Sequence, residues 1–195
     1  MAMRSDRETW GAVARGLHWL SALVIGFGLA HGYWMANLLQ PREARLPHYV
    51  FHSAVMLYLG LLIALRIVWR IGEPTPELPA GTARWERIVA HAAHTALYVL
   101  VIAVLITGFM NWSAFPARFN PQRAADMVIR LFGFWPVPAV HDTLSRDVFK
   151  FWEEGHRLLS FGLAGLVAAH VAAALRHAVG KRNGVMRRMW SGRPL

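Results

Sequence analysis

The most constraining feature of the sequence is one apolar stretch, EEGHRLLSFGLAGLVAAHVAAALRH, at residues 153–177, which contains His156 and His170. These histidines are 14 positions apart, close to four turns of an α-helix, so both side chains leave the same face of one helix. At 1.5 Å per residue they lie about 21 Å apart along the axis, within a hydrocarbon core about 30 Å thick. The stretch therefore predicts a membrane-spanning helix with one histidine near each membrane surface.

Three further apolar runs precede this stretch, and each is long enough to cross a bilayer. The predicted spans cover about residues 15–36, 48–69, 87–112 and 150–178. The first two connections are rich in proline, which is typical of loops. Residues 1–195 are therefore predicted to form a single all-α integral membrane domain, a four-helix transmembrane bundle.

Two helices are also predicted outside the spans. Ser5 and Glu8 fit a capping box, so a helix is expected to begin before the first span. The third connection, residues 113–149, contains AADMVIRLFGFW at 124–135. On a helix this segment separates polar from apolar residues: Arg123, Asp126 and Arg130 against Met127, Val128, Leu131 and Phe132. The pattern favours an interfacial helix in the third connection.

Charge and cysteine content narrow the function classes. The net charge is +10 and no cysteine is present, which excludes disulfides, iron–sulfur clusters and the cysteine attachment of c-type haem. Lys and Arg cluster between the apolar runs, which favours a membrane surface over nucleic acid. Of these 21 residues, 13 lie in the N-terminal segment, the second connection and the tail. The positive-inside rule then predicts that both termini are cytoplasmic.

Membrane depth sorts four histidines into two pairs. His18 and His170 are expected near the cytoplasmic surface, and His52 and His156 near the opposite surface. Ionisable residues inside a membrane are costly and usually functional. Two neutral imidazoles from different helices are the ligands of a six-coordinate haem iron. We therefore predict two haems, b-type because cysteine is absent, held by His18–His170 and His52–His156. Each ligand is expected to donate its other ring N–H to a backbone carbonyl one turn earlier.

Other residues in the runs leave alternatives open. His91 and His94 lie at the cytoplasmic level and either compete as axial ligands or hydrogen-bond a haem propionate or a quinone; the second role is favoured. Arg66, 14 positions after His52, is either a positive-inside anchor or a partner for the same propionate or quinone. The remaining histidines in this set are predicted to be interfacial side chains: His31, His48, His141 and His177. Glycines either admit a flat macrocycle or permit close helix packing, the preferred account for most: Gly26, Gly28, Gly60, Gly108, Gly162 and Gly165.

The motifs that surround the histidines resemble those of the bacterial cytochrome b561 family, which is similar to the cytochrome b subunits of nickel–iron hydrogenases. They are RGLHWL, YVFHSAVMLYLGLLIALRIVWRIGEPTP, AHAAHTALYVLVIAVLITGF and GHRLLSFGLAGLVAAHVAAALRH. The resemblance covers nearly the whole chain. It implies a multi-pass protein of the bacterial inner membrane with four helices, two haem b groups and the same histidine pairing. The third connection is longer than in short members of the family.

The resemblance also implies an activity. One type of member is implied to oxidise superoxide on the periplasmic side and to reduce ubiquinone. Cationic side chains near the outer haem would attract an anion: Arg118, Arg123, Arg130, Arg146, Lys150 and Arg157. Arg157, next to His156, is the preferred catalytic candidate and Lys150 the second, although contact with lipid headgroups explains each residue alone equally well.

Two other functions remain compatible with the sequence. In the first, the same haems serve an electron relay and membrane anchor for a partner dehydrogenase or a c-type cytochrome docked on the third connection. In the second, the protein is a haem-free transporter whose intramembrane histidines relay protons or bind metal. Nucleic-acid binding is not expected, because the basic residues have no soluble fold to lie on.

Overall fold

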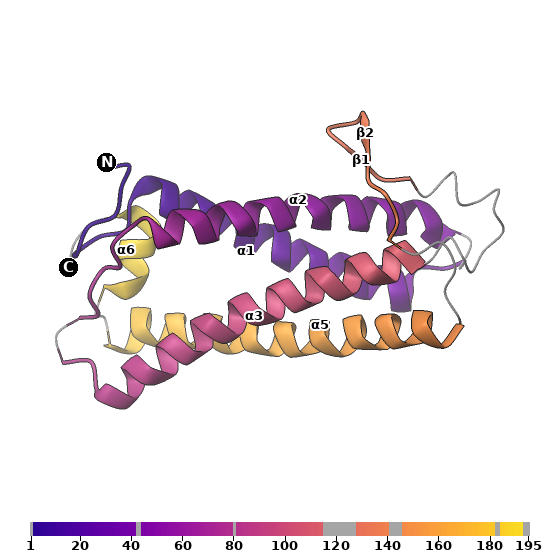
Figure 1. Ribbon diagram of the computed structural model, residues 1–195. Helices are drawn as coiled ribbons and strands as arrows, with labels where there is room; N and C mark the ends of the chain where they lie inside the picture. The colour runs from indigo at the N-terminus through magenta and orange to yellow at the C-terminus, as the bar shows by residue number, and fades with distance from the viewer. Residues whose placement is uncertain are drawn as a thin grey trace. The chain divides into compact units, whose positions relative to one another are not determined.

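Four long helices make up most of the computed structural model, which describes residues 2–41, 44–79, 81–114, 128–140, 146–181 and 184–192. Figure 1 shows α1 (Ala12–Tyr33), α2 (Arg45–Ile71), α3 (Arg84–Ala114), α5 (Arg146–Leu175) and the short α6 (Val185–Ser191). Two π-helical segments continue α1 and α5: η1 (Trp34–Leu38) and η5 (Arg176–Lys181). The long helices are long and apolar enough to cross a membrane. The predicted four-span all-α architecture is confirmed, and each helix begins three or four residues before its predicted span.

The outer surfaces of the long helices are apolar, as expected for a protein that contacts lipid. Large apolar side chains on every long helix are more than half exposed, among them Leu23, Val68, Val99 and Leu158. In water such a surface would be unfavourable, whereas in a bilayer the lipid tails cover it. Helices also satisfy their backbone hydrogen bonds internally, as the hydrocarbon region requires.

Internal contacts divide the chain into two compact units, and each unit contains part of every long helix. Unit 1 comprises Met1–Leu23, Leu61–Val99 and Ala164–Leu195. Unit 2 comprises Val24–Gly60 and Leu100–Leu163. The prediction of a single domain over 1–195 stays a prediction.

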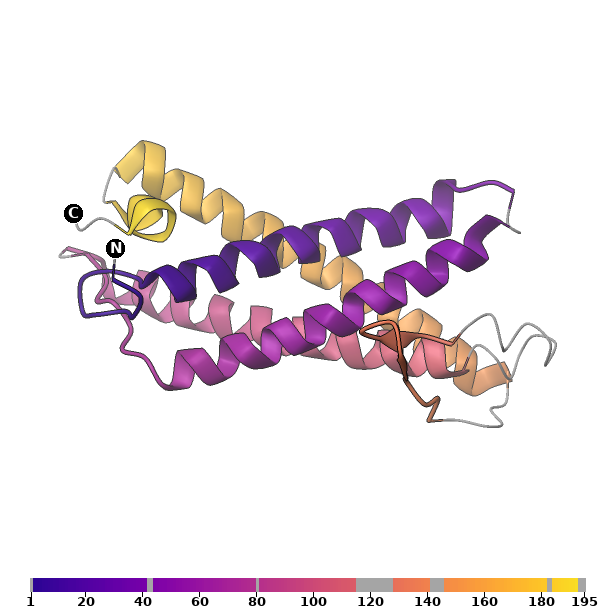
Figure 2. The ribbon, with the colours of Figure 1, turned by 90° about the horizontal axis from the view of Figure 1, so that it is seen from above.

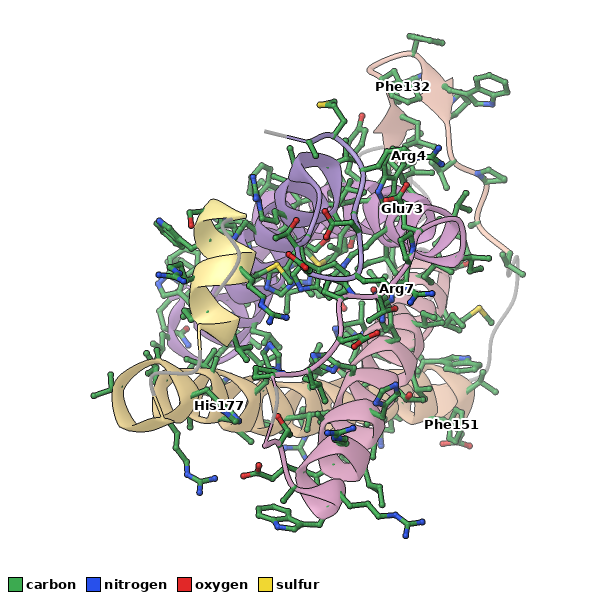
Figure 3. The ribbon with its side chains drawn as sticks, turned by 90° about the vertical axis from the view of Figure 1, so that its left-hand side faces the viewer. Arg4, Arg7, Glu73, Phe132, Phe151 and His177 are labelled. Carbon is green, nitrogen blue, oxygen red and sulfur yellow. The ribbon has the colours of Figure 1, made fainter. Side chains whose placement is uncertain are left out.

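Both chain ends belong to unit 1, where they hold the connection that follows α2. The Glu73 carboxylate accepts hydrogen bonds from Arg4 Nε at 2.7 Å and from the Ser5 backbone N–H. The Glu77 backbone N–H donates to the Arg7 carbonyl at 2.9 Å. The Glu77 carbonyl accepts a hydrogen bond of 2.7 Å from Arg188 of α6. We term these contacts the terminal clasp; Figure 3 shows Arg4 and Glu73 beside each other in it.

The N-terminal segment forms a turn, so the helix predicted from Ser5 and Glu8 is wrong. The Asp6 carboxylate accepts hydrogen bonds from the backbone N–H groups of Glu8 at 2.8 Å and Thr9 at 2.6 Å. The Ser5 hydroxyl accepts from the Gly11 N–H at 3.1 Å. These side-chain acceptors give the backbone an alternative to a helix, and α1 begins only at Ala12.

The described part of the third connection is a β-hairpin, not the predicted interfacial helix. Strands β1 (Arg130–Leu131) and β2 (Trp135–Pro136) pair antiparallel, and Figures 1 and 2 show the hairpin next to α2. Phe132 and Gly133 at its turn have positive φ angles of 54° and 80°. Gly133 and Pro136 both disfavour a helix. Arg123, Asp126 and Met127, also assigned to that helix, lie outside the described residues.

Candidate functional site

In unit 2, one predicted ligand forms a hydrogen bond to the backbone of a neighbouring helix. His156 on α5 has its Nδ1 3.1 Å from the Val104 carbonyl oxygen on α3. Since a carbonyl only accepts, Nδ1 carries the ring proton and Nε2 keeps its lone pair for a metal ion. The expectation that the acceptor lies one turn earlier on the same helix is wrong for His156. Such own-turn bonds occur instead at His91, whose Nδ1 is 3.3 Å from the Arg87 carbonyl.

Thr107 is a second neighbour of the His156 ring that the sequence analysis missed. Its hydroxyl lies 3.4 Å from Nδ1 and donates to the Ala103 carbonyl at 2.8 Å. The hydroxyl is therefore an additional polar contact for the ring proton, of the kind that sets the orientation and basicity of metal-ligating histidines. In the sequence, Thr107 stands directly before Gly108 and four residues before Asn111. Neither position indicates a contact with His156.

Two glycines form cradles for the predicted ligands of unit 2. A Cβ atom at Gly108 would lie 2.9 Å from Cε1 of His156, and one at Gly32 would lie 3.2 Å from Cε1 of His52. Both imidazoles thus rest directly against the backbone of a neighbouring helix. Gly108 was among the glycines considered for close approach, whereas Gly32 was missed.

His52, the predicted partner of His156, has a polar atom without a hydrogen-bond partner in the described part of the chain. This atom is its Nδ1, which is buried. The His31 ring lies parallel to it at 5.8 Å, with an interplanar angle of 12°, and His48 lies 5.6 Å from His31. His31 and His48, predicted as separate interfacial side chains, therefore belong to one cluster with a predicted ligand.

Unit 1 brings together the other predicted pair. The ring centres of His18 and His170 are 6.5 Å apart. Two metal–imidazole bonds of about 2 Å each, with the ring radii added, span about 6–7 Å. The competing pair, His94 and His170, is 5.4 Å apart, which is short for an iron between the rings. The two groups also differ in burial. The predicted ligands are half-buried and the competing histidines are exposed: His18, His52, His156 and His170 against His91 and His94.

Arg66 belongs to unit 1 and contacts a predicted ligand directly. Its guanidinium is 2.8 Å from Nδ1 of His18 and 5.4 Å from the centre of the Tyr98 ring. A guanidinium only donates, so Nδ1 of His18 accepts and a neutral ring carries its proton on Nε2. Arg66 must release His18, or the ring must turn, before Nε2 can bind a metal ion.

The same arginine has no carboxylate partner among the described residues, although it is largely shielded within unit 1. A shielded cation without a counter-ion is costly. This favours an anionic group of a ligand as its partner in the loaded protein.

The donor set of both units fits haem. Each unit supplies two half-buried imidazoles from different helices, and His156 has the proton arrangement of a ligand. Within the described ranges, no group of three or more His, Cys, Asp or Glu side chains could hold a metal ion. Each pair therefore suits a cofactor that itself provides the remaining ligands, as a porphyrin does.

The predicted cationic residues near the outer pair are only partly described. Arg157 is exposed and hydrogen-bonds both carboxylate oxygens of Glu154, at 2.8 Å from Nε and 2.5 Å from a terminal nitrogen. Lys150 and Arg130 are exposed. Arg118, Arg123 and the side chain of Arg146 lie outside the described residues. The Glu154 carboxylate offsets the positive charge of Arg157 and so weakens the attraction of Arg157 for anions.

Comparison with known proteins gives a match over almost the whole chain. The family described as prokaryotic cytochrome b561 matches residues 9–192. Cytochrome b561 homolog 2 of Escherichia coli (strain K12) is 27% identical over 191 residues, which cover 97% of this chain and 95% of that protein.

Proposed function

Since the chain belongs to the prokaryotic cytochrome b561 family, we propose that it carries electrons across the bacterial inner membrane, from superoxide on the periplasmic side to ubiquinone. The chain is a multi-pass membrane cytochrome, and proteins of this family bind haem b. The observation that carries the proposal is the approach of His18 and His170 in unit 1, whose ring centres are 6.5 Å apart. His52 and His156, both in unit 2, are the second proposed pair.

We assign two haem b groups to these pairs, His52–His156 in unit 2 and His18–His170 in unit 1. Bound haem supplies a one-electron couple. The two imidazoles of each pair would hold the haem iron, and a haem held in this way would serve electron transfer. The Val104 carbonyl keeps the ring proton of His156 on Nδ1 and raises the basicity of Nε2. Gly108 and Gly32 allow the rings to approach the helix backbone closely.

Arg66 is assigned to an anionic group of the cofactor in unit 1, and His94 to the quinone. Arg66 is shielded without a carboxylate partner, which favours a haem propionate. His94 lies against His170. Its ring proton is directed at the Ala90 backbone, so the other nitrogen of the neutral ring is an acceptor and suits the hydroxyl of a reduced quinone.

A spectrum of purified protein tests the haem assignment. A reduced-minus-oxidised visible spectrum with a quantified haem-to-protein ratio is expected to give two low-spin b haems per chain. His170→Ala and His156→Ala are each expected to remove one haem and to leave the other spectrum intact. His91→Ala is the matched control and is expected to keep both. Two unaltered haems in His170→Ala would overturn the pairing.

The outer face of α5 offers a test of the superoxide assignment. Lys150, Glu154 and Arg157 share this face at helical spacing. Glu154→Gln would free the charge of Arg157 and is expected to raise the rate of superoxide consumption by about twofold, because anions are attracted more strongly. Lys150→Gln is expected to lower the rate by a similar factor. Both effects should vanish at high salt; equal rates in all three proteins at low salt would remove these residues from the proposal.

An electron relay for a partner dehydrogenase or a c-type cytochrome is the second candidate function. The ion pair between Arg157 and Glu154 favours it, since the pair weakens attraction for a small anion. Purified protein that contains both haems but consumes no superoxide, and that is reduced by a co-purifying redox protein, would support this relay and reject the first function.

A further inference from the structure

The hairpin of the third connection runs alongside the transmembrane helices of unit 2. Ile129 and Val137, which flank it, pack against apolar side chains of α2 and α3: Leu46, Tyr49, Val50, Ala54, Leu57, Phe109 and Trp112. At the far end of this segment, the Val140 N–H donates to the Ser113 hydroxyl at 2.6 Å, near the end of α3. The chain thus leaves the level of the helix ends and turns back along the membrane-spanning surface.

The turn of the hairpin reaches the middle of α2. Tyr58 is the fourteenth of the 27 residues of α2, so it lies about 20 Å from either end of that helix, at the centre of a hydrocarbon core about 30 Å thick. The Phe132 N–H donates to the Tyr58 hydroxyl at 2.8 Å, and the two rings make an edge contact at 5.9 Å. The turn therefore lies at the depth of the bilayer centre.

Three aromatic side chains around this turn are largely exposed. Phe132, Phe134 and Trp135, termed the aromatic tip, are 64%, 68% and 67% exposed. Figure 1 shows the hairpin standing off α2, and Phe132 is labelled on it in Figure 3. An exposed aromatic cluster of this kind is unfavourable in water and suited to an apolar environment.

Several backbone donors of the hairpin are satisfied, which reduces the cost of a non-helical segment at membrane depth. Gly133 and Phe134 donate to carbonyls across the turn, and Val137 donates to Ile129 at 2.9 Å. Phe132 donates to Tyr58, and positions 136 and 138 are prolines without an N–H group. Pro136 in β2 also leaves a poor edge for strand addition by a second copy of the chain.

We propose that the β1–β2 hairpin is a re-entrant segment whose aromatic tip lies among lipid acyl chains. Tyr58 fixes the depth of the turn through its hydroxyl. Arg130, exposed at the start of β1, extends its guanidinium towards the headgroups. The occupant of this surface is lipid, and the third connection is partly a membrane anchor instead of a wholly extramembrane loop.

Spin labels test this directly, because the chain has no cysteine. Phe134→Cys, carrying a nitroxide, is compared in liposomes with two controls from unit 2, Ile106→Cys on the exposed apolar face of α3 and Val140→Cys beyond the hairpin. Collision rates with oxygen and with a water-soluble nickel chelate are measured for each. The reduced-minus-oxidised spectrum of every variant checks that it is folded, and Phe132→Cys replaces Phe134→Cys if that variant is not.

The proposal expects the label at position 134 to behave like that at 106, with frequent oxygen collisions and loss of nickel collisions. Adding Tyr58→Phe to Phe134→Cys is expected to restore nickel collisions in part, since the turn loses its depth-fixing hydrogen bond. Nickel collisions at position 134 equal to those at 140 would overturn the proposal by placing the tip in water. Protection from both reagents would overturn it in favour of a protein partner or a second copy.

Discussion

The position of one proton decides what His156 can do. The Val104 carbonyl accepts from Nδ1, which leaves Nε2 as the only nitrogen able to bind a metal ion. His18 has the opposite arrangement, because Arg66 donates to its Nδ1. The two units therefore differ at the residue scale although each contributes a histidine pair.

Gly108 is expected to be essential for the geometry of His156. In Gly108→Ala the new Cβ would lie 2.9 Å from Cε1 and 3.1 Å from Nδ1 of His156, so the ring must move from its place against α3. We expect loss of about half of the bound haem, or a shifted spectrum of one haem, measured by the haem-to-protein ratio and the reduced-minus-oxidised spectrum.

The matched control for this substitution is Gly60→Ala, because a Cβ there would meet no atom within 4 Å. It should retain the wild-type spectrum. A Gly108→Ala protein with two unaltered haems would show that the close contact at Gly108 has no role in the site.

At this scale the sequence revealed the histidines but not their neighbours. A spacing of 14 residues identifies a shared helix face from local geometry alone, which is why His156 and His170 could be singled out. Thr107, Gly32 and the contact between Arg66 and His18 depend on which faces of different helices meet. No periodicity within one helix contains that information.

At the scale of elements, the long helices were predictable because a bilayer requires about 20 consecutive apolar residues in each. The hairpin was not, because AADMVIRLFGFW has helical amphipathicity and only Gly133 and Pro136 argue against it. Its strands are two residues each, too short for an alternating pattern. Contacts with α2 and α3, which are remote in sequence, decide its conformation.

The N-terminal segment is expected to detach in acid. Hydrogen bonds from Arg4 and Ser5 lower the pKa of Glu73 from its usual 4.5, and the Glu73 side chain is only 5% exposed. A lowered pKa in the folded state means that this stabilisation is complete above about pH 4.5 and is lost as the pH falls through the lowered value. A spin label at Met3→Cys should therefore become mobile only as the pH falls below 4.5 and through the lowered pKa of Glu73.

Glu73→Gln removes the titrating group, so the label mobility should no longer depend on pH in this range. Glu77→Gln is the control, since the clasp uses only the backbone of Glu77, and its acid transition should match that of the unmodified clasp. An acid transition that persists in Glu73→Gln would assign the effect to another group.

For the whole molecule, an even number of spans predicts that both termini lie on one side of the membrane. The distribution of Lys and Arg favours the cytoplasm. A green fluorescent protein fused after Leu195 is expected to fluoresce, and an alkaline phosphatase fused at the same place is expected to be inactive. The reverse result would invert the orientation and exchange the donor and acceptor sides of the proposed function.

The terminal clasp has a consequence for biosynthesis. The ribosome synthesises Arg4 and Arg7 long before Arg188. All three nevertheless hydrogen-bond the same short connection, at Glu73 and Glu77. The connection is therefore held by the N-terminal segment alone until α6 has been synthesised, and Arg188 closes the clasp afterwards. A nascent chain arrested before α6 should differ from the finished protein in that unclosed contact.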